Sequence, residues 1–293
     1  MQRGLLTGPG GSARGRGADL GGQGTYGRAA PGVLAAAPGS LRRERDGALA
    51  DGAERLPAAV AALARLRPLP DAAGLGLGLA HVGEPRLGPG GPAEASAAAP
   101  MAPRRRREFL AGRQAARRAL RAVGLDCGEI PRAGRLPVFA PGRAASISHS
   151  AGIAVAVARG PEEDAPLGCD LELRPLPAGA ARLVLRADEE RLVDTAAGPE
   201  GTPWPLTALF SAKEAAWKAL YPAVGQATAT FMRTLRDLCA RPSGEELWIA
   251  LRADPAYAVR VRSLPVGAGV FSYVVGWADA APPSADGMCD AAD

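Results

Sequence analysis

The sequence predicts an α+β fold, in which helices and strands occur in separate runs rather than in strict alternation. Three observations lead to this prediction. Residues 104–123 repeat apolar side chains at helical spacing, and the apolar runs at 153–158 and 167–173 have the length of buried strands. Near the C-terminal end, the segments ELWIALRA, AYAVRVRS and GVFSYVVGWA indicate three antiparallel strands. This order argues against a doubly wound parallel sheet.

Residues 1–70 are expected to form a disordered or low-complexity extension. The first 50 contain 13 of the 38 glycines and no sustained apolar periodicity. They therefore offer no core that would offset the entropy of ordering them. A short helix over 55–66 is the one element expected in this part. A first strand follows over 75–82, and a loop rich in Gly, Pro and Ala over 83–103.

The middle of the chain is expected to hold a strand pair followed by a run of helices. The segment ASISHS at 145–150 is expected to pair with the strand at 153–158 around Ser150-Ala151-Gly152. Helices are expected over 179–195, 205–221 and 230–240, before the three C-terminal strands.

The composition restricts the class of partner. The net charge is +5, and residues 1–50 carry +4 of it, so the rest of the chain is nearly neutral. With 4% aromatic residues and no zinc-binding motif, this composition argues against a nucleic-acid partner. No apolar run approaches the ~20 residues of a membrane span, and the N-terminus lacks the apolar core of a signal peptide. We expect a cytoplasmic protein without a membrane span, and we expect a monomer.

A pair of carboxylates marks the strand predicted at 167–173. Residues i and i+2 of a strand point to the same face, so Asp170 and Glu172 should lie side by side while Cys169 and Leu171 face the core. Two carboxylates on one face repel each other unless a cation lies between them, and oxygen ligands suit Mg²⁺. The alternative is a half-buried strand with a solvated outer face, because D-x-E alone is a weak pattern.

The helix FSAKEAAWKAL at 210–220 holds the only two lysines among 35 basic residues. Glu214 and Lys218 are four residues apart and share a face, with Lys213 alongside. If these lysines only solvated a helix face, arginine would be expected there as elsewhere in the chain. A compact ammonium is preferred where a point charge must fit beside a phosphate or a metal. This helix is therefore the second candidate site.

Two further groups are candidate anion ligands. Ser148 and His149 lie in a serine-rich segment at a strand entry, where hydroxyls and imidazole can hold phosphate oxygens. Arg113 and Arg117 are four residues apart on the basic helix, for which a solvated face is the alternative. For the run 104–107 the solvated face is the expectation.

Together these segments resemble one family, the 4′-phosphopantetheinyl transferases of the large type, typified by the enterobactin and surfactin synthetase transferases. The ordered pair G-x-D-x-E and F-S-x-K-E-x-x-x-K, with 44 residues from Asp170 to Glu214, makes the resemblance specific. Cys169 departs from the family pattern, which usually has Ile or Val there. The matching segments are REFLAGRQAAR at 107–117, RLPVFAPGRAASISHS at 135–150, GCDLEL at 168–173 and FSAKEAAWKAL at 210–220.

The resemblance implies an activity and a fold. Family members move the phosphopantetheine arm of coenzyme A onto a serine of an apo acyl or peptidyl carrier protein and release 3′,5′-ADP. The carriers belong to polyketide, nonribosomal peptide or fatty acid synthases, including those for siderophores and other secondary metabolites. The implied fold consists of two similar halves packed as a pseudo-dimer, here about 75–160 and 166–279, with the site between them.

The resemblance also implies roles for the residues that match its motifs. Asp170, Glu172 and Glu214 would hold Mg²⁺, and Glu214 would take the serine proton, directly or through water. Lys218 would be catalytic and would bind phosphate together with Lys213. The remaining contacts to coenzyme A would come from Arg113, Arg117, Arg135, Ser148 and His149.

Two other classes of function are alternatives. A degenerate protein would bind coenzyme A or a carrier without transfer, but all three carboxylates are present, so no feature of the sequence favours this reading. A nucleic-acid-binding module would rest on the basic N-terminal segment and on the helix at 104–121. It lacks the aromatic residues on which bases stack.

Overall fold

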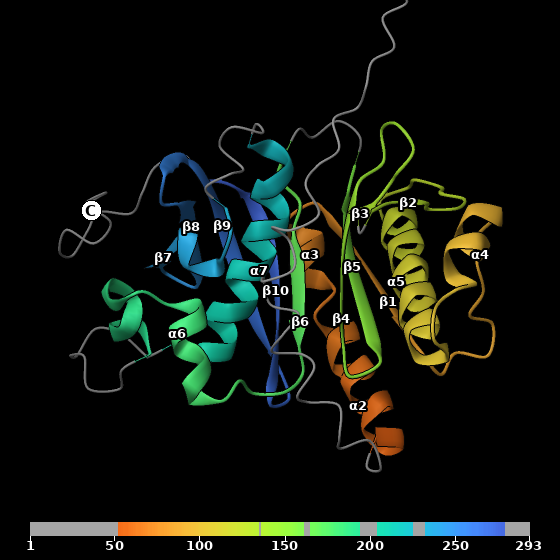
Figure 1. The fold of residues 1–293 in the computed structure, drawn as a ribbon, viewed down its shortest axis with the longest axis horizontal. Helices are drawn as coiled ribbons and strands as arrows, with labels where there is room; N and C mark the ends of the chain where they lie inside the picture. Colours follow the sequence, from red (N-terminus) through yellow and green to blue (C-terminus); the bar gives the residue numbers. More distant parts are fainter. Residues whose placement is uncertain (1–51, 135, 161–164, 194–203, 225–231, 279–293) are drawn as a thin grey trace, which may run out of the picture. The chain divides into compact units, whose positions relative to one another are not determined.

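The structure is a computed structural model that describes residues 52–134, 136–160, 165–193, 204–224 and 232–278 (Figure 1). All of these described residues fall within one compact unit. Its elements are helices and antiparallel strands in separate runs, so the predicted α+β class is confirmed.

The first sheet has three antiparallel strands in the order β1-β5-β4. β5 is buried at every position because its valines face one apolar cluster and its alanines face another. The predicted pairing of 145–150 with 153–158 is confirmed. Ala151 and Gly152 make the turn between these strands with φ of 49° and 81°. The bounds are β1 Leu75–His81, β4 Ala145–Ser150 and β5 Ile153–Arg159.

Helix α5 (Pro103–Ala122) packs against the alanine-lined face of this sheet (Figure 1). The contact is close because glycines on β1 leave room for the helix backbone. A Cβ atom at Gly78 would lie only 2.0 Å from the carbonyl oxygen of Ala115. The glycines that weaken LGLGLAH as a strand pattern are therefore the residues that allow α5 to approach.

The second sheet has five antiparallel strands in the order β6-β10-β9-β8-β7, and helix α7 (Leu206–Ala223) packs against it. Gly168, just before β6, has the same role in this sheet as the glycines of β1 have in the first. A Cβ there would lie 2.0 Å from the carbonyl oxygen of Ala215, so the absence of a side chain lets α7 approach. The bounds are β6 Cys169–Glu172, β7 Leu238–Ser243, β8 Glu246–Leu251, β9 Asp254–Val266 and β10 Gly269–Trp277.

The two sheets share an order of connection. In each, a first strand is followed by the long helix and later by a hairpin, and the second hairpin strand lies beside the first strand. This gives β1-β5-β4 in one sheet and β6-β10-β9 in the other, where β7 and β8 extend the edge. The shared order supports the division into similar halves at about 75–160 and 166–279, which remains a proposal.

The N-terminal extension ends earlier than residue 70. Helix α2 (Gly52–Arg65) and helix α3 (Pro68–Ala72) precede β1, and the Leu63 side chain is fully buried. Leu63 joins an apolar cluster that contains side chains from both sheets, including Val155 on β5 and Phe271 on β10. The short helix expected over 55–66 is thus present as part of α2, and the helical residues reach further than the extension 1–70 predicted, because tertiary burial stabilises a helix too short to persist alone. Residues 1–51 lie outside the described part.

Three other expectations differ from the structure. The loop expected over 83–103 contains helix α4 (Pro92–Ala98), which begins with a proline at its first position. The helix expected over 179–195 consists of short pieces, and in 230–240 a 3-10 turn leads into β7. The short pieces are η1 Ala178–Ala180, α6 Ala181–Val184 and η2 Ala187–Leu192. Pairing of β7 with β8 overrides the local helical pattern.

Two minor features complete the description. A two-stranded hairpin of β2 (Arg132–Ala133) and β3 (Leu136–Pro137) lies between α5 and β4. None of the described helices is long and apolar enough to span a lipid bilayer.

Candidate active site

The carboxylates of β6 are buried. Cys169 and Leu171 enter the apolar cluster shared by the two sheets, so strand alternation directs Asp170 and Glu172 to the opposite face. Asp170 is 0% and Glu172 5% exposed, because both β4 and α7 pack against β6. The alternative of a solvated outer face is therefore wrong. Burial of two neighbouring carboxylates is costly unless cations or hydrogen-bond donors compensate for it.

Two donors from different elements converge on one oxygen of Asp170. Ser148 Oγ on β4 donates a hydrogen bond to Asp170 Oδ1 at 2.7 Å, and Lys218 Nζ on α7 donates to the same atom at 2.9 Å. Lys218 Nζ also donates to the carbonyl oxygen of Cys169 at 2.9 Å. The structure thus brings together three of the residues singled out in the sequence, at the junction of β4, β6 and α7.

Alternate serines of β4 join the edge strands of the two sheets. The Cys169 amide donates to Ser146 Oγ at 2.9 Å, and the Leu173 amide donates to Ser150 Oγ at 3.1 Å. With the bond from Ser148 to Asp170, three side chains with a spacing of two residues connect β4 to β6 where no backbone ladder does. The hydroxyls of this serine-rich segment were expected to hold phosphate oxygens, whereas those of Ser146 and Ser150 accept hydrogen bonds from backbone amides at the two ends of β6.

Glu214 lies on α7, the helix that supplies Lys218 to this junction. It is 8% exposed and lies one helical turn before Lys218, on the helix that packs against β6. The carboxylates of Asp170, Glu172 and Glu214 are an oxygen-only donor set, which fits a hard cation such as Mg²⁺. Within the described ranges, however, no three His, Cys, Asp or Glu side chains gather closely enough to form a metal site on their own.

Lys213 does not join this group. Its ammonium is fully buried on another face of α7, within 2.8 Å of both carboxylate oxygens of Glu189. It also donates to the carbonyl oxygens of Val184 at 2.9 Å and Leu238 at 3.0 Å. Burial lowers the pKa of Lys213 to about 8, although the Glu189 carboxylate partly opposes this shift. Lys213 is therefore not placed as the phosphate ligand that the sequence predicted. It is next to Glu214 in the sequence, but adjacent positions of a helix point ~100° apart, so the two side chains face different surroundings.

The two arginines of α5 are held in buried contacts. Arg113 Nε donates to the carbonyl oxygen of Ile130 at 2.8 Å, and its guanidinium lies 4.6 Å from the centre of the Phe109 ring. Burial lowers the pKa of Arg113 to about 10, and neighbouring arginines contribute to the shift. Arg117 forms a 2.6 Å ion pair with buried Glu94. Both cations therefore help to shape the segment around residue 130, and neither is a solvated helix face.

His149 lies beside Arg105, which belongs to the run 104–107 that was expected to form a solvated helix face. His149 Nε2 lies 3.0 Å from Nη1 of Arg105, in the first turn of α5. Arg105 is exposed and also pairs with Glu108 at 3.4 Å. Nothing in the local pattern distinguishes Arg105 from its neighbours in the run 104–107, so only the packing of α5 against β4 identifies it. Arg135 lies outside the described residues.

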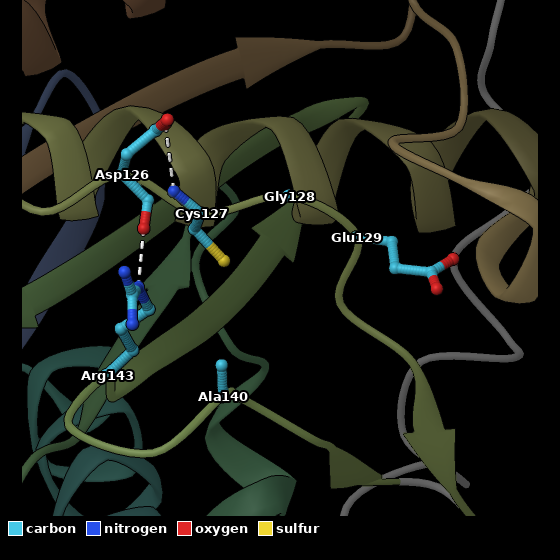
Figure 2. Close-up of a pocket in the computed structure, with 6 residues that line it drawn as sticks. All are labelled: Asp126, Cys127, Gly128, Glu129, Ala140 and Arg143. Atoms are coloured by element: carbon cyan, nitrogen blue, oxygen red, sulfur yellow. Dashed lines mark hydrogen bonds between the residues drawn. The ribbon is translucent and has the colours of Figure 1, made fainter.

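A cavity of about 330 Å³ lies near the C-terminal end of α5 (Figure 2). Arg143 crosses one side of it and donates through Nε to the carbonyl oxygen of Asp126 at 2.5 Å. Cys127 and Glu129 are also among its lining residues. None of the predicted site residues is among its lining residues, so this cavity is separate from the Asp170 junction.

Comparison with known proteins gives concordant matches. Residues 93–159 match the family described as the 4′-phosphopantetheinyl transferase N-terminal domain, and residues 166–265 match the 4′-phosphopantetheinyl transferase superfamily. The chain is 36% identical over 137 residues to 4′-phosphopantetheinyl transferase Svp of Streptomyces mobaraensis. That alignment covers 46% of this chain and 55% of the relative, so the chain spans about half the length of the relative. The chain belongs to the 4′-phosphopantetheinyl transferase superfamily.

Proposed function

We propose that the protein transfers the 4′-phosphopantetheine arm of coenzyme A to a serine hydroxyl of an apo carrier protein. The serine oxygen forms a bond to the phosphorus of the pantetheine arm, the pyrophosphate bond breaks, and 3′,5′-ADP leaves. The observation that carries the proposal is the buried junction of Asp170 with Ser148 and Lys218. Superfamily membership supports it, because the family matches span both α5 and α7.

The junction contains the groups that attack at a pyrophosphate requires. Such a reaction builds negative charge on phosphate oxygens, and catalysis consists mostly of positioning and electrostatic stabilisation. Lys218, partly exposed beside Asp170, would hold phosphate oxygens. Glu214, buried one turn away, would accept the proton of the serine hydroxyl, directly or through a water molecule.

Asp170, Glu172 and Glu214 would hold the Mg²⁺ ion. Mg²⁺ usually takes one or two protein carboxylates and completes its coordination with water and substrate phosphates. This preference accounts for a site whose carboxylates do not form a closed three-ligand group without substrate. When bound, the ion would neutralise charge on the pyrophosphate oxygens.

A basic region beside the junction would hold the nucleotide end of coenzyme A. Arg105 and His149 lie together where α5 meets β4, and Arg105 and Arg132 are near enough to lower the pKa of Arg113. Phosphate groups are the anions that such a cluster of guanidinium groups binds best. We assign Arg113, Arg117, His149 and Arg135 to this end as proposed contacts. In the structure Arg113 and Arg117 are engaged by Ile130 and Glu94, just as Ser148 and Lys213 are engaged by Asp170 and Glu189.

The test is incubation with coenzyme A, Mg²⁺ and apo carriers from polyketide, nonribosomal peptide and fatty acid synthases, followed by intact-mass measurement. A carrier that gains one phosphopantetheine group, together with release of 3′,5′-ADP, supports the proposal. Glu214→Gln should abolish the gain without unfolding the protein, whereas Glu190→Gln, at an exposed position, is the matched control and should leave it unchanged. Wild-type protein that modifies none of the carriers would contradict the proposal.

Several finer assignments belong to the same proposal. The successive matches to an N-terminal and a second transferase family model favour the large type, in which one chain supplies both halves of the site. A cytoplasmic monomer is the proposed active form. The alternative of a degenerate binding protein predicts coenzyme A binding by calorimetry with no modified carrier, and the mass measurement separates the two.

A further inference from the structure

Lys213 and Glu189 form a buried centre that the proposed chemistry does not use. Lys213 precedes Glu214 on α7, and its ammonium is 0% exposed. An ammonium has three N–H donors, and those of Lys213 are taken by Glu189, the Val184 carbonyl and the Leu238 carbonyl, all within 3.0 Å. The ammonium therefore faces the interior of the second half, away from Asp170.

Glu189 connects this ammonium to three other segments. Its Oε1 accepts a 2.8 Å hydrogen bond from the Ala240 amide on β7, and its Oε2 accepts one from the Arg186 amide at 3.2 Å. Arg252 Nη2 lies 2.9 Å from Oε2 and also pairs with Asp188. Two cations and two carboxylates thus balance one another in a centre that joins η2, α7, β7 and the turn after β8.

Stability alone is a weak explanation for this centre. Burying charges carries a desolvation penalty that commonly equals or exceeds the Coulombic gain, and apolar replacements of buried ion pairs are often no less stable. The best-attested use of a buried polar group is to select one packing geometry over others. The choice of lysine, in a chain where 33 of 35 basic residues are arginine, suits three acceptors that surround one compact charge.

The apolar contacts of α7 do not by themselves fix the rotation of the helix. The apolar side chains buried between Phe210 and Leu220 are all small, namely Ala212, Ala215, Ala216 and Ala219, and the large buried side chains of α7 stand only at the two ends of this stretch. Small side chains form shallow ridges, so packing alone distinguishes poorly between neighbouring rotations and axial positions of a helix. Each residue of shift turns the helix by ~100°, which would carry Glu214 and Lys218 away from β6.

We propose that Lys213 is a positioning residue, whose buried pairing with Glu189 fixes the rotation of α7 and so presents Glu214 and Lys218 to Asp170. The proposal rests on the proposed function for the roles of Glu214 and Lys218. It assigns Lys213 and Glu189 no contact with substrate.

The kinetic test compares Lys213→Met and Glu189→Gln with Leu63→Ala, which removes a fully buried side chain from a different apolar cluster. We expect Lys213→Met to lower kcat at least tenfold while the KM for coenzyme A changes less than threefold. Glu189→Gln should act in the same direction and more weakly, because the amide still accepts hydrogen bonds. Leu63→Ala should lower the melting temperature at least as far and keep kcat within twofold of wild type.

Two results would overturn the proposal. One is a folded Lys213→Met protein with kcat within twofold of wild type, and the other is an equal loss of kcat in Leu63→Ala, which would show general destabilisation. If circular dichroism shows that Lys213→Met does not fold, Glu189→Gln takes its place in the same comparison with the same limits.

Amide hydrogen exchange separates this proposal from the proposed function. We expect the amides of α7 to exchange at least tenfold faster in Lys213→Met than in wild type, and to be unchanged in Leu63→Ala. Unchanged α7 exchange in Lys213→Met would refute the positioning role. A wild-type protein that modifies no carrier would refute the proposed function instead, and the exchange rates would still decide whether Lys213 fixes α7.

Discussion

Ser148 on β4 donates a 2.7 Å hydrogen bond to Asp170 on β6, and so joins the edge strands of two different sheets. Ser148 and Asp170 are 22 residues apart. Lys218, far along the chain, reaches the same carboxylate oxygen. The candidate active site therefore depends on the contact between the sheets as much as on either half.

Replacing Ser148 by Ala should slow transfer. The substitution removes one of the donors that orient Asp170, and groups that orient a metal-binding carboxylate commonly affect activity or metal affinity 10- to 100-fold. We expect about a tenfold rise in the Mg²⁺ concentration that gives half-maximal transfer. Ser150→Ala is the matched control, because Ser150 contacts the Leu173 amide and not Asp170. Equal effects of the two substitutions on Mg²⁺ dependence would argue against the assignment.

Replacing Lys218 by Arg should reduce kcat/KM at least tenfold, a barrier increase of about 1.4 kcal/mol. The guanidinium keeps the charge but is broader and planar, so it cannot reproduce the two 2.9 Å contacts to Asp170 and the Cys169 carbonyl. Steady-state transfer kinetics measure the effect. The reverse exchange at an exposed ion pair, Arg260→Lys, provides the control and should leave kcat/KM unchanged. Full activity of Lys218→Arg would remove Lys218 from the site.

A chelator should abolish transfer, and added Mg²⁺ should restore it. The reason is that Asp170, Glu172 and Glu214 are oxygen donors with little exposure, a set that suits a hard divalent cation. Intact-mass measurement of the carrier before and after chelation provides the readout. Undiminished modification in excess chelator would show that these carboxylates do not act through a metal.

Leu63→Ala should destabilise the protein by about 2–5 kcal/mol, the usual cost of removing a fully buried leucine side chain. Leu63 packs in a cluster that includes residues of both sheets, so the loss should appear in one cooperative transition of thermal unfolding. Deletion of residues 1–50 is the comparison, since that sequence lacks apolar periodicity and should leave the melting temperature nearly unchanged. A Leu63→Ala protein as stable as wild type would contradict the packing of α2.

The ion pair of Glu84 with Arg118 should add to stability only above acidic pH. Partial burial raises the pKa of Glu84, but the hydrogen bonds and charge of Arg118 outweigh this effect, so the pKa lies below its ordinary value of 4.5. The pair's contribution is therefore present above pH 4.5 and is lost as pH falls through the lower pKa of the folded state. Wild type should lose more stability than Glu84→Gln on acidification, as urea unfolding at several pH values would show. Parallel losses in the two proteins would refute this.

Much of the site could be predicted from local pattern. Strand alternation placed Asp170 and Glu172 on one face, and helical spacing placed Glu214 beside Lys218. Helical spacing also separates the two lysines. Lys213 and Lys218 are five positions apart, which places their side chains ~140° apart around the helix axis. The two lysines could not share a face, and the structure buries Lys213 against Glu189 while Lys218 contacts Asp170.

The sequence by itself determined the local properties of this protein: the α+β class, the β4–β5 hairpin, the long helices α5 and α7, and the donor types at the site. These follow from interactions between residues close in the chain, such as turn geometry, strand alternation and helical periodicity. Only the tertiary structure decided what lies opposite each side chain. Packing of β4 beside β6 turned Ser148 toward Asp170, and strand pairing made 238–240, the end of the helix expected over 230–240, part of β7. The physical reason is that burial and hydrogen bonding between distant segments outweigh local propensities of a few tenths of a kcal/mol per residue.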